Sequence, residues 1–202
     1  MAETGLPLVA AALRQGEGAS SDFDLTPGAG QPAGRRLRPA AVLVALLPGP
    51  AGLEVLLTKR SSKLRHHPGQ IAFPGGRLDP GDGGSPEAAA LREAQEEVGL
   101  DPALVRVLGR LPPHETVTSF HVTPVVAELA ARFEPVAEAG EVEEVFTVPL
   151  DFLADPANFR VEGRRWQGTR RHYYAVPWGP YYIWGATARI LKGLADRVAA
   201  CR

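Results

Sequence analysis

The chain has 202 residues, 45% of them hydrophobic, and its formal net charge at pH 7 is -1. That length suits one domain with a sizeable core, and so small a net charge argues against nucleic acid or a membrane as a partner. A single cysteine, Cys201, excludes an internal disulfide and fits a reducing compartment, so we expect a cytoplasmic protein. No apolar run approaches the roughly 18 to 20 residues of a membrane span, and the N-terminus lacks the basic and apolar regions of a signal peptide.

The first 38 residues are expected to form a partly irregular N-terminal extension ahead of a single domain at 39–202. Within the extension, Leu6–Arg14 is expected to form a short helix, and 20–35, which is rich in Gly, Pro and polar residues, is expected to form a loop. Two predicted strands, 40–47 and 53–59, then flank a Pro- and Gly-rich turn, which predicts a hairpin.

A basic segment follows at 56–76, LLTKRSSKLRHHPGQIAFPGG, which we call the signature segment. It contains a short predicted strand at 71–73 and ends in a Pro-Gly-Gly turn. Arg60 and Arg65 supply guanidinium groups, which bind phosphate oxygens in bidentate fashion. Its glycines allow a ligand to approach the backbone closely: Gly69, Gly75 and Gly76. A surface loop that only aids solubility is the alternative, and the acidic helix that follows makes phosphate binding the stronger interpretation.

A helix is predicted over 86–98, because Ser85 suits an N-cap, Pro suits the first helical position and Gly99 suits a C-cap. Three carboxylates on this helix are spaced i, i+3, i+4 and therefore point to one side: Glu93, Glu96 and Glu97. They repel one another unless a cation lies among them, and their hard oxygen atoms suit Mg²⁺ or Mn²⁺. Arg92 can orient one of these carboxylates. A solvated acidic face is the alternative.

After the helix, strands are predicted at 105–111 and 122–129. The linker between them either faces the site or is an ordinary exposed connection. The segment 130–142 is expected to be a loop that carries Glu134, Glu138 and Glu141, and a short strand and a short helix follow it at 144–148 and 149–153.

The C-terminal part predicts a second hairpin, 159–166 with 172–176, and a final helix that runs to about residue 199. Arginine and aromatic residues crowd this hairpin, so it could meet an adenine or a phosphate, although cross-strand packing is the simpler explanation. Four residues recur at helical spacing near the final helix and are expected in the core: Trp184, Ala188, Leu191 and Ala195.

Two motifs in the middle of the chain resemble those of a known family. Residues 92–100, REAQEEVGL, match R-E-U-x-E-E-x-G-U, the core of the Nudix box. The signature segment can be written L-L-T-x-R-S-x3-R-x3-G-x3-F-P-G-G, and this resembles the signature of the coenzyme A diphosphatase branch of the Nudix hydrolases. One departure is that the position of the early glutamate of the box holds Gly84. Asp79, Asp82 and Glu87 are candidates to replace that glutamate.

The resemblance implies a Nudix-type α/β/α sandwich with a mixed central sheet, whereas the predicted elements alone support only α/β or α+β. It implies metal-dependent hydrolysis of coenzyme A to 3′,5′-ADP and 4′-phosphopantetheine. The implied metal ligands are Glu93 and Glu97, with Glu96 close behind. The implied catalytic set is Glu96, Glu97, Arg92 and Glu141, of which Glu141 would be a further metal contact or the general base. Another nucleoside diphosphate derivative as substrate, or a nucleotide sensor without activity, are alternatives, and the oligomeric state is open, with a homodimer as one option.

Overall fold

The structure, a computed structural model, describes residues 4–16, 18–26, 34–166 and 169–202. Its helices are α1 (Leu6–Leu13), α2 (Pro86–Val98), α3 (Leu150–Leu153) and α4 (Gly185–Ala200), with short 3-10 turns at Pro80–Asp82, Pro102–Leu104 and Pro156–Asn158. Its strands are β1 (Ser20–Ser21), β2 (Arg38–Gly49), β3 (Gly52–Arg60), β4 (Ile71–Ala72), β5 (Gly75–Arg77), β6 (Val105–Arg110), β7 (His114–Glu115), β8 (Phe120–Leu129), β9 (Val142–Pro149), β10 (Arg160–Trp166) and β11 (Thr169–Ala175).

A mixed sheet forms the centre of the molecule. Its described strands run in the order β1-β7-β8-β2-β3-β4, while β5 pairs with β2, β6 with β8 and β9 with β3. The predicted hairpin of β2 and β3 is antiparallel, whereas β2 and β8 are parallel. Because a parallel pair needs a long crossover connection, the signature segment and α2 lie between these two strands in the chain.

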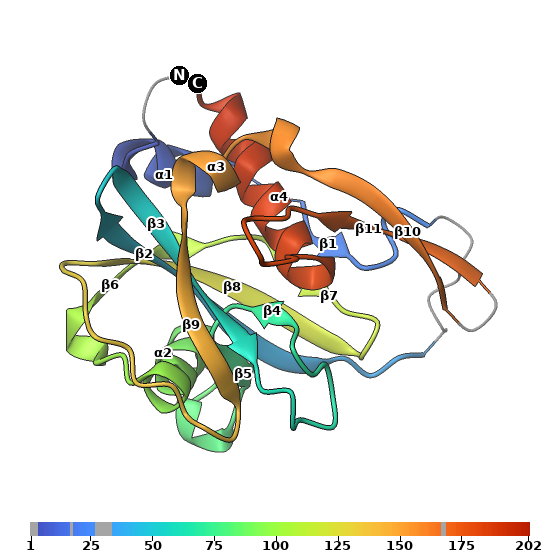
Figure 1. The fold of residues 1–202 in the computed structure, drawn as a ribbon, viewed down its shortest axis with the longest axis horizontal. Helices are drawn as coiled ribbons and strands as arrows, with labels where there is room; N and C mark the ends of the chain where they lie inside the picture. The colour runs from blue at the N-terminus through green and yellow to red at the C-terminus, as the bar shows by residue number, and fades with distance from the viewer. Residues whose placement is uncertain (1–3, 17, 27–33, 167–168) are drawn as a thin grey trace.

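Residues of the central strands alternate between two cores, one on each face of the sheet. On β2, Val44 and Leu46 belong to the core that α1, α3 and α4 cover, whereas Leu43 and Ala45 belong to the core under α2. Figure 1 shows α2 on one side of the sheet and the other three helices on the opposite side. The predicted α/β/α sandwich is therefore confirmed. None of the described helices is long and apolar enough to cross a membrane.

Helix α2 has the bounds that its sequence predicts. The Ser85 hydroxyl accepts a hydrogen bond from the Ala88 amide at 3.2 Å, and Pro86 is the first helical residue. Gly99 ends the helix with φ 69°, in the left-handed region that favours glycine. The small side chains of Ala90 and Ala94 are fully buried, so the helix axis can lie close to the sheet.

The N-terminal segment contacts elements far along the chain. Helix α1 buries Val9 in the same core as α4. The expectation of a loop over 20–35 is wrong at β1, which pairs in parallel with β7; residues 27–33 of that expectation lie outside the described residues. The pairing is fixed by buried His114, whose Nδ1 lies 2.9 Å from Ser20 Oγ and whose Nε2 lies 3.0 Å from Asp22 Oδ1. The linker between β6 and β8 therefore packs its His114 side chain against the N-terminal segment.

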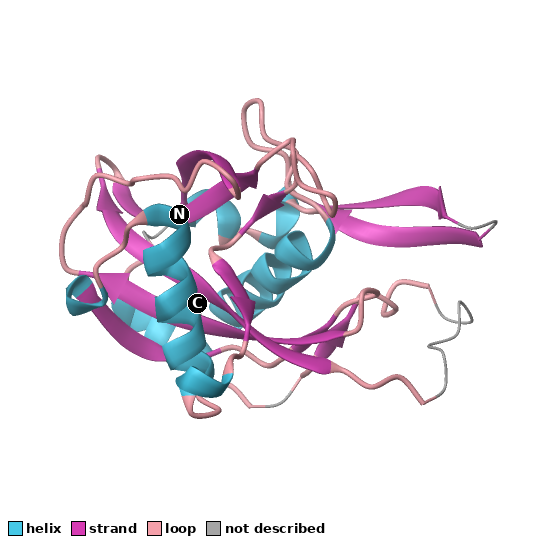
Figure 2. Ribbon diagram, turned by 90° about the horizontal axis from the view of Figure 1, so that it is seen from below, coloured by secondary structure: helices cyan, strands magenta, loops and turns pink. Residues whose placement is uncertain are grey.

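Strands β10 and β11 form an antiparallel ribbon, which we call the arm. Among the described residues, neither strand pairs with the central sheet. Figures 1 and 2 show the arm extending away from the sheet at one end of the molecule. The last helix also agrees with its prediction, except that Trp184 is only partly buried at the N-cap of α4 and does not lie in the core.

Candidate active site

Two glutamates of α2 face the Pro-Gly-Gly turn of the signature segment. Glu97 is only 5% exposed, and its Oε2 accepts a hydrogen bond from the Gly75 amide at 3.2 Å. The Glu93 carboxylate lies against Gly76, where a β-carbon would be 2.3 Å from Glu93 Oε1. Because glycine has no β-carbon, the turn can approach both carboxylates directly.

Gly75 has a second reason to be glycine. Its φ is 156°, and a β-carbon at this position would lie 2.4 Å from the backbone oxygen of Ala41 on β2. Backbone atoms of a central strand cannot move aside as a flexible side chain can. Glycine at this position therefore allows β5 to pair closely with β2. This pairing also positions the Gly75 amide that donates a hydrogen bond to Glu97.

The surroundings of Glu97 and Glu93 disfavour the charged form of both carboxylates. Burial is the main cause that raises the pKa of Glu97 to about 8, and repulsion by Glu93 and Glu141 adds to it, while the Gly75 amide and Arg60 oppose it. Burial likewise raises the pKa of Glu93, against the stabilising effect of its contact with Arg92. Three carboxylates and two guanidinium groups are therefore close enough to influence one another, and a bound cation would relieve the repulsion among the acids.

Arg92 links α2 to the turn that precedes it. Its Nε and Nη2 donate to the two carboxylate oxygens of Asp82 at 3.0 and 3.2 Å. Its Nη1 donates to Glu93 at 3.0 Å and to Glu96 at 3.2 Å. Glu96 is held at the outer side of the helix with its side chain 60% exposed, so the structure does not place it beside Glu97.

Asp82 is the candidate replacement for the early glutamate of the box that pairs with Arg92. Its side chain is 4% exposed and also accepts the Asp79 amide at 2.7 Å. Asp79 itself is 61% exposed and lies 3.8 Å from Arg92, and Glu87 instead pairs with Arg110. Of the three acids that the sequence offers as replacements for the early glutamate of the box, Asp82 is therefore the one in bidentate contact with Arg92.

We predict that Asp82→Ala lowers kcat/KM about tenfold or more, in the range typical for loss of a residue that supports a metal ligand. Without Asp82, the guanidinium of Arg92 loses the contact that fixes its orientation toward Glu93. Steady-state kinetics on the natural substrate would measure the effect, with Glu87→Ala as the control because its partner is Arg110. Equal losses in both variants would contradict a specific role for Asp82.

The acidic loop after β8 is tied to both α2 and the signature segment. The Glu138 amide donates to the Glu97 carbonyl at 2.9 Å, and the Ser61 amide donates to the Glu141 carbonyl at 2.8 Å. Glu143 accepts Lys59 Nζ at 2.6 Å and the Ser62 amide at 3.2 Å. These contacts bring the exposed side chain of Glu141 close enough to Glu93 and Glu97 to raise the pKa of both. The sequence gives no signal for these two contacts of Glu143, because its partners lie more than 80 residues away along the chain.

The two arginines that the sequence proposes for phosphate binding lie at different distances from the carboxylates. Arg60, at the end of β3, favours the charged form of Glu97 and is therefore near it. Arg65 is exposed, and no hydrogen bond or ion pair of its side chain occurs among the described residues, so the structure does not bring it to the carboxylates. Gly69 has φ 68°, and open space surrounds the position of a β-carbon.

The chemistry of these carboxylates can be compared with what a divalent metal ion requires. Among the described residues, no three His, Cys, Asp or Glu side chains come together as a complete ligand set. Glu93 and Glu97, with Glu141 close by, offer the hard oxygen atoms that Mg²⁺ and Mn²⁺ prefer. Mg²⁺ is commonly held by one or two carboxylates together with water and substrate phosphates. The donor set therefore fits a Mg²⁺ or Mn²⁺ ion that shares its coordination with a bound diphosphate.

Comparison with known proteins identifies the family. Residues 37–167 match the model of the NUDIX domain. The chain belongs to the Nudix family. It is 41% identical over 165 residues to the uncharacterized Nudix hydrolase NudL of Enterobacter, a match that covers 80% of this chain and 83% of that protein.

Two further proteins are similar to this Nudix hydrolase. Nudix hydrolase 15 of Arabidopsis thaliana, which is named as mitochondrial, is 43% identical over 159 residues. That match covers 75% of this chain but only 55% of the Arabidopsis protein, so the chain spans about half the length of that relative. The crystal structure of a MutT/nudix family protein from Enterococcus faecalis has a TM-score of 0.51 and 18% identity, and it covers 85% of this chain and 65% of that chain. It supports the fold alone.

Proposed function

We propose that this Nudix hydrolase cleaves the diphosphate bond of coenzyme A to give 3′,5′-ADP and 4′-phosphopantetheine. The observation that carries the proposal is the contact between the signature segment and the acidic helix: the turn that ends this segment donates its Gly75 amide to Glu97. The pattern of the segment resembles that of coenzyme A diphosphatases, and this resemblance supports the choice of substrate.

In this proposal, Glu93 and Glu97 hold a Mg²⁺ or Mn²⁺ ion, and Glu96 can complete the set if it leaves Arg92. When bound, such an ion neutralises charge on the diphosphate and lowers the pKa of a water molecule. Arg60 binds phosphate oxygens next to Glu97, and Arg65 binds the substrate from the exposed side of the segment. Gly69, Gly75 and Gly76 let the diphosphate approach the backbone.

The hydrolytic step breaks one P–O bond of the diphosphate while water oxygen forms a new P–O bond. The water proton goes to a carboxylate, and we assign this role to Glu141, because its side chain is exposed yet near Glu93 and Glu97. Arg92 keeps Glu93 in place through its own contacts with Asp82.

Purified protein incubated with coenzyme A and Mg²⁺ or Mn²⁺ should release 3′,5′-ADP and 4′-phosphopantetheine, resolved by chromatography, and EDTA should stop the release. A panel of ADP-ribose, NADH and a nucleotide sugar provides the comparison. Turnover of another diphosphate without turnover of coenzyme A would overturn the substrate assignment. No turnover of any compound with either metal would overturn the proposed activity itself.

A further inference from the structure

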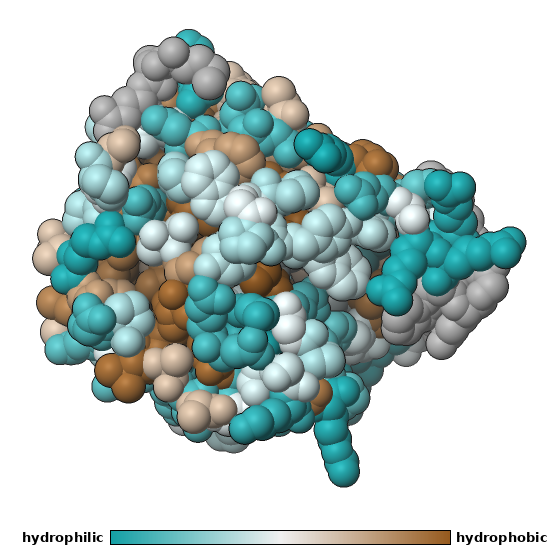
Figure 3. Space-filling model, in the orientation of Figure 1, coloured by the Kyte–Doolittle hydropathy of each residue, from teal (hydrophilic) through white to brown (hydrophobic). Residues whose placement is uncertain are grey.

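The outer part of the arm carries two opposed pairs of arginines. In the strand register, Arg164 lies opposite Arg171 and Arg165 lies opposite Arg170. Like charges directly opposite each other destabilise a strand pair. None of these four arginines takes part in an ion pair among the described residues. Figure 3 shows hydrophilic residues gathered on the arm. Neither arginine pair has an acid opposite it in the register, and Glu162, on the same face as Arg164, accepts a hydrogen bond from the Tyr182 hydroxyl. An anion bound at the arm would relieve this excess of positive charge.

Guanidinium donors are also in excess where the arm meets Phe23 of the N-terminal segment. Arg171 Nε and Arg35 Nη1 are buried and have no hydrogen-bond acceptor. Their guanidinium carbons lie 5.4 and 5.3 Å from the centre of the Phe23 ring. Other nitrogen atoms of Arg35 donate to Ser119 Oγ, so its orientation is fixed. Two guanidinium nitrogen atoms therefore lack an acceptor where the arm and the N-terminal segment meet.

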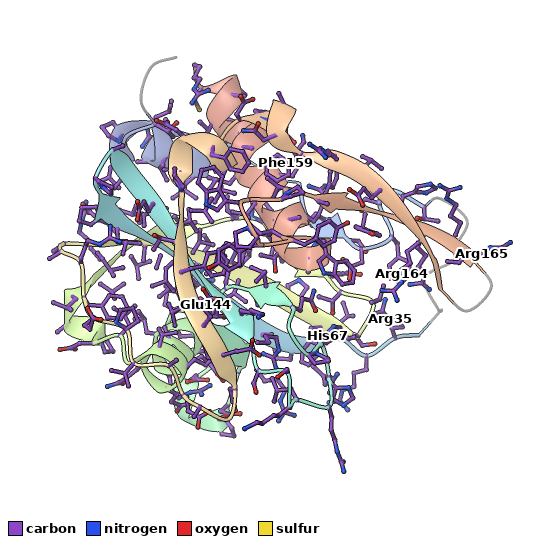
Figure 4. All side chains as sticks on the ribbon, in the orientation of Figure 1. Arg35, His67, Glu144, Phe159, Arg164 and Arg165 are labelled. Atoms are coloured by element: carbon purple, nitrogen blue, oxygen red, sulfur yellow. The ribbon has the colours of Figure 1, made fainter. Side chains whose placement is uncertain are left out.

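One face of the arm is connected to the signature segment through the start of α4. Alternation along a strand puts Arg164 and Arg171 on the same face as the pair Glu162 and Tyr173. The Tyr173 ring lies 5.2 Å from the ring of Trp184, the residue before Gly185 at the start of α4. Figure 4 shows Arg164, Arg35 and His67 toward the same side of the molecule.

Helix α4 completes this connection at its first turn. A β-carbon on Gly185 would lie 3.7 Å from Gln70 Nε2, and the Thr187 hydroxyl donates to the Ile71 carbonyl at 3.0 Å. Both partners belong to the signature segment. These contacts connect the face of the arm that carries Arg164 to the signature segment through the start of α4, while Arg165 and Arg170 lie on the opposite face.

We propose that Arg164, supported by Arg171, binds a phosphate group that the substrate carries in addition to the diphosphate that is cleaved. The guanidinium fork matches two phosphate oxygens. The proposal rests on the proposed function, and in coenzyme A this group is the 3′-phosphate. The arm is then the element that selects coenzyme A over nucleoside diphosphate derivatives that lack a phosphate monoester.

The test compares coenzyme A with dephospho-coenzyme A as substrates. Wild type should prefer coenzyme A in kcat/KM, and Arg164→Met should remove about tenfold of that preference, the effect of a lost hydrogen bond to a charged group. The loss should fall on KM for coenzyme A, with kcat and the kinetics of dephospho-coenzyme A unchanged. Arg164→Lys should recover part of the preference, and Arg165→Met, on the opposite face, should keep all of it. Equal kcat/KM for the two substrates in wild type would overturn the inference and leave the proposed function standing.

A binding measurement makes the inference independent of turnover. Isothermal titration of wild type with 3′,5′-ADP and with AMP, which lacks the 3′-phosphate, should give tighter binding of 3′,5′-ADP, and Arg164→Met should abolish the difference. Equal affinities in wild type, or a difference that survives in Arg164→Met, would contradict a phosphate site on the arm, whether or not coenzyme A is hydrolysed.

Discussion

Glu97→Gln should fold normally and lose about 10³-fold of its hydrolytic activity, which corresponds to roughly 4 kcal/mol of barrier. Glutamine has the same shape and can still accept the Gly75 amide, but it lacks the charge that a Mg²⁺ or Mn²⁺ ion requires. Single-turnover and steady-state kinetics over a range of metal concentrations would measure the loss. Near-normal activity would remove Glu97 from the metal site.

The same variant has a second signature in metal-free buffer. Glu97 ionises at its ordinary pKa of 4.5 in the unfolded chain and at about 8 in the folded protein. Folding therefore takes up a proton between these pH values, and the stability of wild type relative to Glu97→Gln falls as pH rises through this window. Thermal melts should show the variant as the more stable protein at pH 8 and the two as equal below about pH 4.5. If wild type were as stable as Glu97→Gln at pH 8, the charge of Glu97 would already be compensated in the folded protein.

Glu96→Gln is the matched control for both measurements. It is one position away and is also a glutamate, but its side chain is exposed and contacts Arg92. We expect a smaller loss of activity and no pH-dependent gain in stability. Equal effects of the two substitutions would contradict the distinction between a buried and an exposed carboxylate.

Local signals predicted the acidic helix and much of the sheet. The bounds of α2 follow from Ser85, Pro86 and Gly99, each of which acts on the backbone within a few residues. The β2–β3 hairpin follows from two apolar runs around a Pro- and Gly-rich turn. Such features depend on short-range chemistry, and a single sequence is enough to find them.

Contacts between distant segments were the part that the sequence could not supply. Asp82 was one of three acids with comparable spacing, and only the fold shows that its carboxylate is turned toward Arg92. Strand β1 has two serines and no strand-like pattern, and its pairing depends on His114, more than 90 residues away. Like charges on the arm were visible in the sequence, but the face that each arginine occupies follows from the strand register.

Gly76→Ala should lower kcat/KM about 10²-fold while the protein keeps its fold. The added β-carbon would lie 2.3 to 2.6 Å from the carboxylate atoms of Glu93, so that side chain must move, whereas no backbone atom is among the three nearest. A displacement of about 1 Å at a reacting group can cost that much in rate. Gly81→Ala is the control, because a β-carbon there meets nothing within 4 Å. Kinetics and thermal melts of the two variants separate a displaced ligand from a damaged fold. A Gly76→Ala enzyme with normal kcat/KM would show that Glu93 can leave its observed position without loss, and would therefore argue against Glu93 as a metal ligand.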